Sequence, residues 1–141
     1  MTSQPGIERA DGLVLFGITG DLSKKKLIPA LYRMAEHDRL PSIVLGVASS
    51  DWDLERLRLH VRTSLENAHV DTRPEVLDRL CDSLRYVSGD YRDAATFAQV
   101  AEQIDGCRRP VCYLAIPPGL FDEVIQGLAS IGLHEKGRVV L

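Results

Sequence analysis

Two glycines and a run of lysines follow a short apolar segment near the start of the chain. The stretch from Gly17 to Lys24 reads Gly-Ile-Thr-Gly-Asp-Leu-Ser-Lys, and two further lysines come after it. Glycines at such a turn let a phosphate group approach the backbone, and the N–H groups and dipole at the start of a following helix attract anions. These residue types favour a phosphate-binding turn. The alternative is a tight turn whose lysines form a solvated helix face.

Other phosphate-binding and catalytic motifs fit this sequence less well. The turn contains neither G-x-x-x-x-G-K-[ST] nor G-x-G-x-x-G, which are the signatures of nucleoside-triphosphate and common dinucleotide sites. The four histidines and three cysteines lack the spacing of metal ligands. We therefore expect no metal site, and we expect surface histidines and reduced thiols.

The elements that must position this turn follow from the apolar pattern. Continuous apolar runs predict five strands, at 13–16, 43–48, 86–87, 111–116 and 139–141. Between them, apolar residues recur at helical spacing, which predicts helices within 27–35, 54–65, 76–84, 97–104 and 124–131. Pro29 should kink the first helix or mark its regular start, and Pro117 with Pro118 should end the fourth strand.

Strands that alternate with helices predict an α/β fold. Because each crossover returns right-handed across the sheet, we expect a doubly wound parallel sheet with helices on both faces. One domain over 13–141 should follow an N-terminal tail at 1–12. The last apolar run stops at Leu141, shortly after Gly137, and we interpret this as a truncated or excised domain.

Composition and charge narrow the class of protein. With 45% hydrophobic and 26% charged residues, the chain has the balance of a soluble globular protein. A formal net charge of -3 gives no general attraction to nucleic acid or an anionic membrane. No stretch approaches the roughly 18 apolar residues of a membrane span, and the first residues lack a signal core. We expect a cytoplasmic protein that binds neither nucleic acid nor membrane.

The turn also resembles a known family. Residues 17–32, Gly-Ile-Thr-Gly-Asp-Leu-Ser-Lys-Lys-Lys-Leu-Ile-Pro-Ala-Leu-Tyr, resemble the fingerprint G-x-[ST]-G-D-L-[AS]-x-[KR]-K-x-x-P-[AT]-[LI] of glucose-6-phosphate dehydrogenases. The similarity continues through residues 45–49, 86–91 and 113–118, and so covers the chain from Leu13 onward.

The resemblance implies a Rossmann-like coenzyme domain of an enzyme that oxidises glucose 6-phosphate with NADP, NAD being possible, in the pentose phosphate pathway. In the family a larger α+β domain follows and supplies the sugar-phosphate site and the dimer interface. The family's E-K-P-[FL]-G and R-I-D-H-Y-L-G-K-E segments, with the substrate lysine and the general base, are absent from these 141 residues. No residue is therefore assigned a catalytic role. We expect this chain alone to be inactive, to bind coenzyme weakly and to associate, and the intact protein to bind glucose 6-phosphate as a homo-oligomer.

The resemblance also implies the coenzyme-binding residues. They are Gly17, Ile18, Thr19, Gly20, Asp21, Leu22, Ser23 and Lys24 around the diphosphate, with Ser49, Asp90 and Tyr91 near the adenosine end. Asp21 has an equally good alternative as a helix cap, and Thr19 as an ordinary turn hydroxyl. Asp90 and Tyr91 have the alternative of a turn aspartate and a packing tyrosine. Trp52 is expected to pack rather than to stack on adenine.

Coenzyme choice is expected to lean to NADP with tolerance of NAD. Many family members have arginine where this chain has Ser49, and a serine offers one neutral hydroxyl in place of a charged fork. Asp51 can either cap the next helix or accept a bond from a bare ribose.

Two alternative functions belong to other classes. One is a stand-alone nucleotide-binding or regulatory module, and the other is a dehydrogenase or epimerase with a Tyr-x-x-x-Lys pair, which the sequence lacks after the fourth strand.

Overall fold

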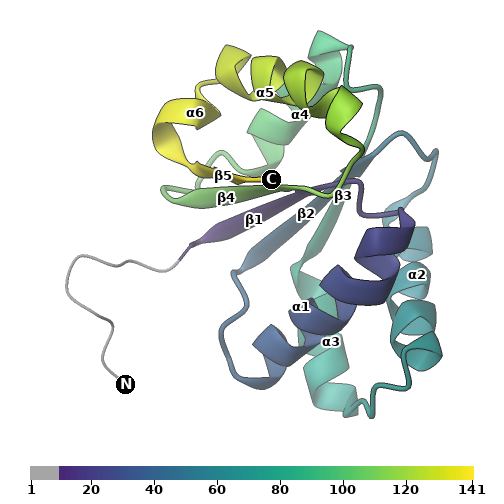
Figure 1. The fold of residues 1–141 in the computed structure, drawn as a ribbon. Helices are drawn as coiled ribbons and strands as arrows, with labels where there is room; N and C mark the ends of the chain where they lie inside the picture. Colours follow the sequence, from purple (N-terminus) through teal and green to yellow (C-terminus); the bar gives the residue numbers. More distant parts are fainter. Residues whose placement is uncertain (1–9) are drawn as a thin grey trace.

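The computed structural model describes residues 10–141, apart from the side chain of His134. Its centre is a five-stranded sheet in the order β3-β2-β1-β4-β5 (Figure 1). The strands are β1 (Gly12–Phe16), β2 (Ile43–Ala48), β3 (Leu84–Ser88), β4 (Pro110–Leu114) and β5 (Arg138–Val140). All neighbouring strands are parallel. The order and direction confirm the predicted doubly wound α/β fold.

Helices cover both faces of the sheet, as Figure 1 shows. One layer contains α1 (Ile28–Glu36), α2 (Leu54–Asn67) and α3 (Pro74–Ser83), and the other contains α4 (Ala94–Gln103), α5 (Phe121–Ser130) and α6 (Leu133–Lys136). Because side chains alternate between the two faces along a strand, the side chains of β1 pack against both helical layers. Val14 and Phe16 join the cluster under α4 and α5, while Leu15 joins the cluster under α1 and α2.

The strand register brings four strand ends to one edge of the sheet. Phe16, the last residue of β1, is level with Val47 of β2 and Leu114 of β4, and Ala48 is level with Ser88 of β3. The strand order reverses between β1 and β4, which makes this the topological switch point where doubly wound sheets bind ligands. The turns after these four strands therefore meet at the expected binding edge.

Some predicted boundaries are wrong by a few residues. Leu84 was expected on a helix face but begins β3, and its complete burial explains why its apolar character fits either element. β4 ends at Leu114 and not at Ile116, since the chain turns toward Pro117 and the 3-10 segment η2 (Pro118–Leu120). Ile125 was expected to face the core and is 40% exposed.

The first helix begins irregularly. A π-helical turn, η1 (Ser23–Leu27), precedes α1, and the regular helix starts at Ile28 with Pro29 in its first turn. This confirms the expectation that Pro29 marks where the regular helix begins, because proline cannot donate a hydrogen bond to the preceding turn. The three lysines lie in η1.

The expected N-terminal tail lies outside the described residues at positions 1–9. In the described part, Gly12 already belongs to β1. The Asp11 carboxylate accepts bonds from the backbone N–H groups of Arg108 (2.6 Å) and Arg109 (2.8 Å). The strand start is thus tied to the loop before β4. Within residues 10–141, no helix is long and apolar enough to cross a membrane, and no cluster of acidic, histidine or cysteine side chains could hold a metal ion.

Candidate functional site

The turn after β1 folds tightly against two neighbouring strand ends. Gly17 has φ of 86° and donates its N–H to the Val47 carbonyl at 2.8 Å. Its own carbonyl accepts bonds from the Gly20 N–H at 3.0 Å and the Ser23 hydroxyl at 2.8 Å. A Cβ at Gly17 would lie 2.2 Å from the Ala115 carbonyl oxygen. Only glycine fits here, because the backbone conformation is left-handed and the space is already filled.

The turn leads directly into a helix start. Gly20 is exposed, and its carbonyl accepts the Lys24 N–H at 3.0 Å. The first N–H groups of a helix have no partner within it and carry the positive end of its dipole. Ile18 is completely buried against Gly46, so that only its backbone can face a ligand. The turn therefore presents backbone and small polar groups at the sheet edge, which is what a phosphate requires.

Ser50 connects three segments at this edge. Its hydroxyl lies 3.0 Å from the Thr19 hydroxyl in the glycine turn. Its carbonyl accepts bonds from the Tyr86 hydroxyl at 2.6 Å and the Ser88 hydroxyl at 2.9 Å, both on β3. Burial, together with the charge of Asp51, raises the pKa of Tyr86 to about 12. Ser50 thus links the turns after β1 and β2 to the end of β3.

Asp90 and Tyr91, the other predicted residues, hold the loop after β3. The Asp90 carboxylate accepts the Arg92 N–H at 2.8 Å, and its carbonyl accepts the Thr96 hydroxyl at 2.7 Å. The Tyr91 hydroxyl donates to the Val47 carbonyl at 3.2 Å, the same oxygen that Gly17 binds. Burial raises the pKa of Tyr91 to about 12, so the hydroxyl stays a donor at neutral pH. Both residues lie at the same sheet edge as the glycine turn.

Ser49, Asp21 and Leu22 are exposed at this edge, and Lys24 is half-buried. The helix cap considered for Asp51 belongs instead to Asp53, whose carboxylate accepts the Arg56 N–H at 2.8 Å. Asp21 is not the N-cap residue of η1. Leu22 occupies that position, and it makes no side-chain cap bond. Asp53 has the extended backbone that an N-cap residue adopts, so Asp53 and not Asp51 caps α2.

Three further residues pack together beyond the end of β2, and none of them was predicted to bind the coenzyme. The Arg56 guanidinium lies over the Trp52 ring, 5.0 Å from its centre, and the His60 ring meets Trp52 edge-on at 5.0 Å. Burial lowers the pKa of His60, as do the charges of Lys24 and Arg56. Arg56 and His60 are four residues apart on α2 and so lie on one helix face, while Trp52 precedes the Asp53 cap of that helix.

Two open hollows lie elsewhere. One, of about 290 Å³, runs between α4 and α5 and is lined by Tyr91, Phe97, Glu123 and Gln126 among others. The second, of about 230 Å³, lies beyond the end of α1, where Arg79 and Asp82 of α3 face Leu40 and Ser42. Apart from Tyr91, neither hollow contains a residue predicted to bind the coenzyme.

A family model described as "Glucose-6-phosphate dehydrogenase, NAD binding domain" matches residues 14–141. Among curated proteins, the chain is 40% identical over 133 residues to glucose-6-phosphate 1-dehydrogenase 1 of Mycobacterium tuberculosis. It is 36% identical over 139 residues to glucose-6-phosphate 1-dehydrogenase 2 of the same species. These alignments cover 94% and 92% of the chain but only 28% and 27% of the two relatives.

Solved structures give the same result. The glucose-6-phosphate 1-dehydrogenase of Mycobacterium avium superposes with a TM-score of 0.87 at 40% identity, over 92% of this chain and 29% of that one. A glucose-6-phosphate dehydrogenase solved with its substrate glucose 6-phosphate gives a TM-score of 0.82 at 25% identity, over 100% of this chain and 31% of that one.

Proposed function

Because the chain belongs to the glucose-6-phosphate dehydrogenase family, whose coenzyme-binding domain it matches, we propose that it binds a nicotinamide coenzyme at the carboxyl edge of its sheet. The observation that carries the proposal is the turn at Gly17, whose positive φ and contact with Ala115 leave no room for a side chain. Such a turn lets a diphosphate reach backbone N–H groups at a helix start.

Each predicted residue takes a role within this binding mode. The backbone of residues 17–24 holds the diphosphate, with Lys24 adding charge. Thr19 and Ser49 face the ribose of the adenosine half, and Ser50 fixes the Thr19 hydroxyl through their 3.0 Å contact. Asp90 and Tyr91 border the adenine, while their bonds within the chain keep the loop in place.

The whole protein's reaction belongs to the same proposal. We propose that it oxidises glucose 6-phosphate at C1 to 6-phosphogluconolactone, a reaction of the pentose phosphate pathway, as a cytoplasmic homo-oligomer. When bound, the nicotinamide ring supplies the hydride acceptor. The residues of this chain position that acceptor, since the family's general-base and substrate-lysine segments do not occur in these 141 residues. The chain assayed alone should therefore give no turnover above a control without enzyme.

Coenzyme binding by the 141-residue chain tests the proposal by calorimetry. NADP and NAD should each bind one site, and Gly20→Val should weaken both, because Gly20 is exposed at the turn and its Cβ would already lie 3.3 Å from the Gly17 carbonyl. Gly106→Val is the matched control, since a Cβ at Gly106 meets nothing within 4 Å. No binding by the folded chain, or equal effects of the two variants, would overturn the proposal.

Coenzyme preference has its own test at Ser49. We propose a modest preference for NADP, because Ser49 offers a neutral hydroxyl where an arginine would bind the 2′-phosphate through charged bonds. Ser49→Arg should raise the ratio of NADP to NAD affinity roughly ten- to thirty-fold, which corresponds to about 1 to 2 kcal/mol. An unchanged ratio in the calorimetric titrations would mean that Ser49 does not face the 2′ position.

A further inference from the structure

Arg56 lies in the first turn of α2, which follows the end of β2, where the adenosine ribose is proposed to bind. The Arg56 guanidinium rests 5.0 Å from the centre of the Trp52 ring, and the backbone N–H of Trp52 donates to the Ser50 carbonyl at 2.8 Å. Ser50 in turn touches Thr19 in the glycine turn. Arg56 is therefore connected, through Trp52 and Ser50, to the Thr19 hydroxyl, which is proposed to face the adenosine ribose.

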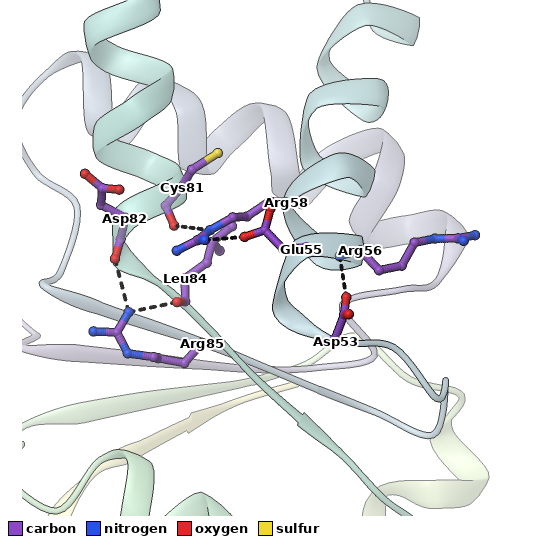
Figure 2. Close-up of polar contacts among 8 residues, drawn as sticks. All are labelled: Asp53, Glu55, Arg56, Arg58, Cys81, Asp82, Leu84 and Arg85. Atoms are coloured by element: carbon purple, nitrogen blue, oxygen red, sulfur yellow. Dashed lines mark hydrogen bonds and ion pairs between the residues drawn. The ribbon is translucent and has the colours of Figure 1, made fainter.

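The direction of Arg56 separates it from the other arginine of this helix turn. Figure 2 shows Arg58 reaching toward Glu55 and Cys81, whereas Arg56 extends to the opposite side. Arg58 is neutralised by Glu55 at 2.6 Å. Within residues 10–141, no carboxylate lies within ion-pair distance of Arg56, and the Asp53 carboxylate is occupied by the Arg56 backbone N–H. The Arg56 charge is thus available to an anion.

A second cation acts on the same region. Lys24, in η1, and Arg56, in α2, both act electrostatically on His60, whose ring packs against Trp52. Both charges therefore influence the same imidazole although 32 positions separate them in the sequence. An NADP site needs positive charge at the end of β2, whereas in an NAD site an acidic residue binds the ribose. Asp51, exposed at this end, is acidic, and Lys24 of η1 and Arg56 of α2 supply the positive charge.

We propose that Arg56, held by Trp52, binds the 2′-phosphate of NADP and so supplies the charge that Ser49 lacks. This proposal rests on the proposed coenzyme site. Stacking on an aromatic ring restrains the long arginine side chain, so that less freedom is lost when it binds a phosphate. The preference of the wild-type chain for NADP then comes from the first turn of α2, and an arginine at position 49 would add to it.

Two ligands that differ only in the 2′-phosphate test the proposal on the 141-residue chain. These are adenosine 2′,5′-bisphosphate and adenosine 5′-monophosphate, titrated by calorimetry. Arg56→Gln should weaken the bisphosphate about tenfold or more and leave the monophosphate unchanged, as expected for loss of a charge-assisted contact. Arg56→Lys should retain part of the preference, and Trp52→Leu should reduce it. Arg58→Gln is the matched control and should change neither affinity.

The outcomes separate the two proposals. If the folded wild-type chain binds neither ligand, the proposed coenzyme site is wrong and this inference with it. If both ligands bind but Arg56→Gln keeps the wild-type ratio, the site stands and Arg56 has no part in it. An equal loss for both ligands also overturns the inference, because Arg56 would then act on the adenosine or on the fold. Thermal unfolding of each variant confirms that it is folded.

Discussion

At position 17 the backbone itself demands glycine. The φ of 86° costs most residues about 1 to 2 kcal/mol, and a Cβ would press on the Ala115 carbonyl at 2.2 Å. Gly17→Ala should therefore lower the free energy of unfolding by at least that amount and weaken coenzyme binding. Gly106→Ala, in open space, should change stability by much less. Urea denaturation of the two variants makes the comparison, and equal stabilities would contradict the strained turn.

His60 gives a prediction about pH. Burial lowers its pKa below the usual 6.5, and the charges of Lys24 and Arg56 lower it further. As pH falls, the unfolded chain takes up the proton near 6.5 and the folded chain only at lower pH. The unfolded state binds more protons in that interval, so the contribution of His60 to stability is complete above pH 6.5 and is lost as pH falls toward the folded pKa.

The variant His60→Gln isolates this effect. Between about pH 8 and about pH 5, the wild-type chain should lose more unfolding free energy than His60→Gln does. His37→Gln, at an exposed position beyond α1, should behave as the wild type. Chemical denaturation across this range measures the difference. Parallel curves for the wild type and His60→Gln would show that the imidazole does not titrate differently in the folded chain.

At the scale of elements, the cap of α2 distinguishes two neighbouring aspartates. Asp53 accepts the Arg56 N–H at 2.8 Å from an extended backbone, whereas Asp51 is exposed beyond the end of β2. Asp53→Ala should lower stability by about 1 kcal/mol, the usual value of such a cap. Asp51→Ala should have little effect on unfolding. If thermal denaturation finds the larger loss at Asp51, the assigned start of α2 is wrong.

Most elements were predictable because each has a clear apolar period. The strands β1, β2 and β4 are continuous apolar runs. Apolar residues at helical spacing mark the buried faces of α2 and α4. The junction of α3 and β3 was not predictable, since Leu84 suits both patterns and no turn residue separates them. The short α6 has too few residues to show a period.

The candidate site was predictable only in its local part. The turn at 17–24 is contiguous, so its glycines and lysines could be identified from their order. The contact between Thr19 and Ser50 spans 31 positions and follows from the order of the strands in the sheet. Trp52 and Arg56 are only four positions apart, but their contact depends on the backbone between the end of β2 and the start of α2.

At the scale of the whole molecule, β5 forms one edge of the sheet in residues 10–141. Its residues are exposed, including Val139 at 38%, Val140 at 40% and the adjacent Leu141 at 66%. An exposed apolar edge strand favours pairing with another chain. The 141-residue chain should therefore self-associate as its concentration rises, and Val140→Lys should reduce this. Light scattering over a concentration series measures it, and a strictly monomeric species at high concentration would contradict the prediction.

The central claim is that a nicotinamide coenzyme binds where the turns after β1, β2 and β3 meet. Amide NMR spectra of the 141-residue chain, recorded while NADP is added, test this claim most directly. Shifts should concentrate on residues 17–24, 49–52 and 89–91, around the positive φ of Gly17 and the hydroxyl pair of Thr19 and Ser50. Shifts confined to α4 and α5 or to the opposite sheet edge, or none at saturating coenzyme, would contradict it.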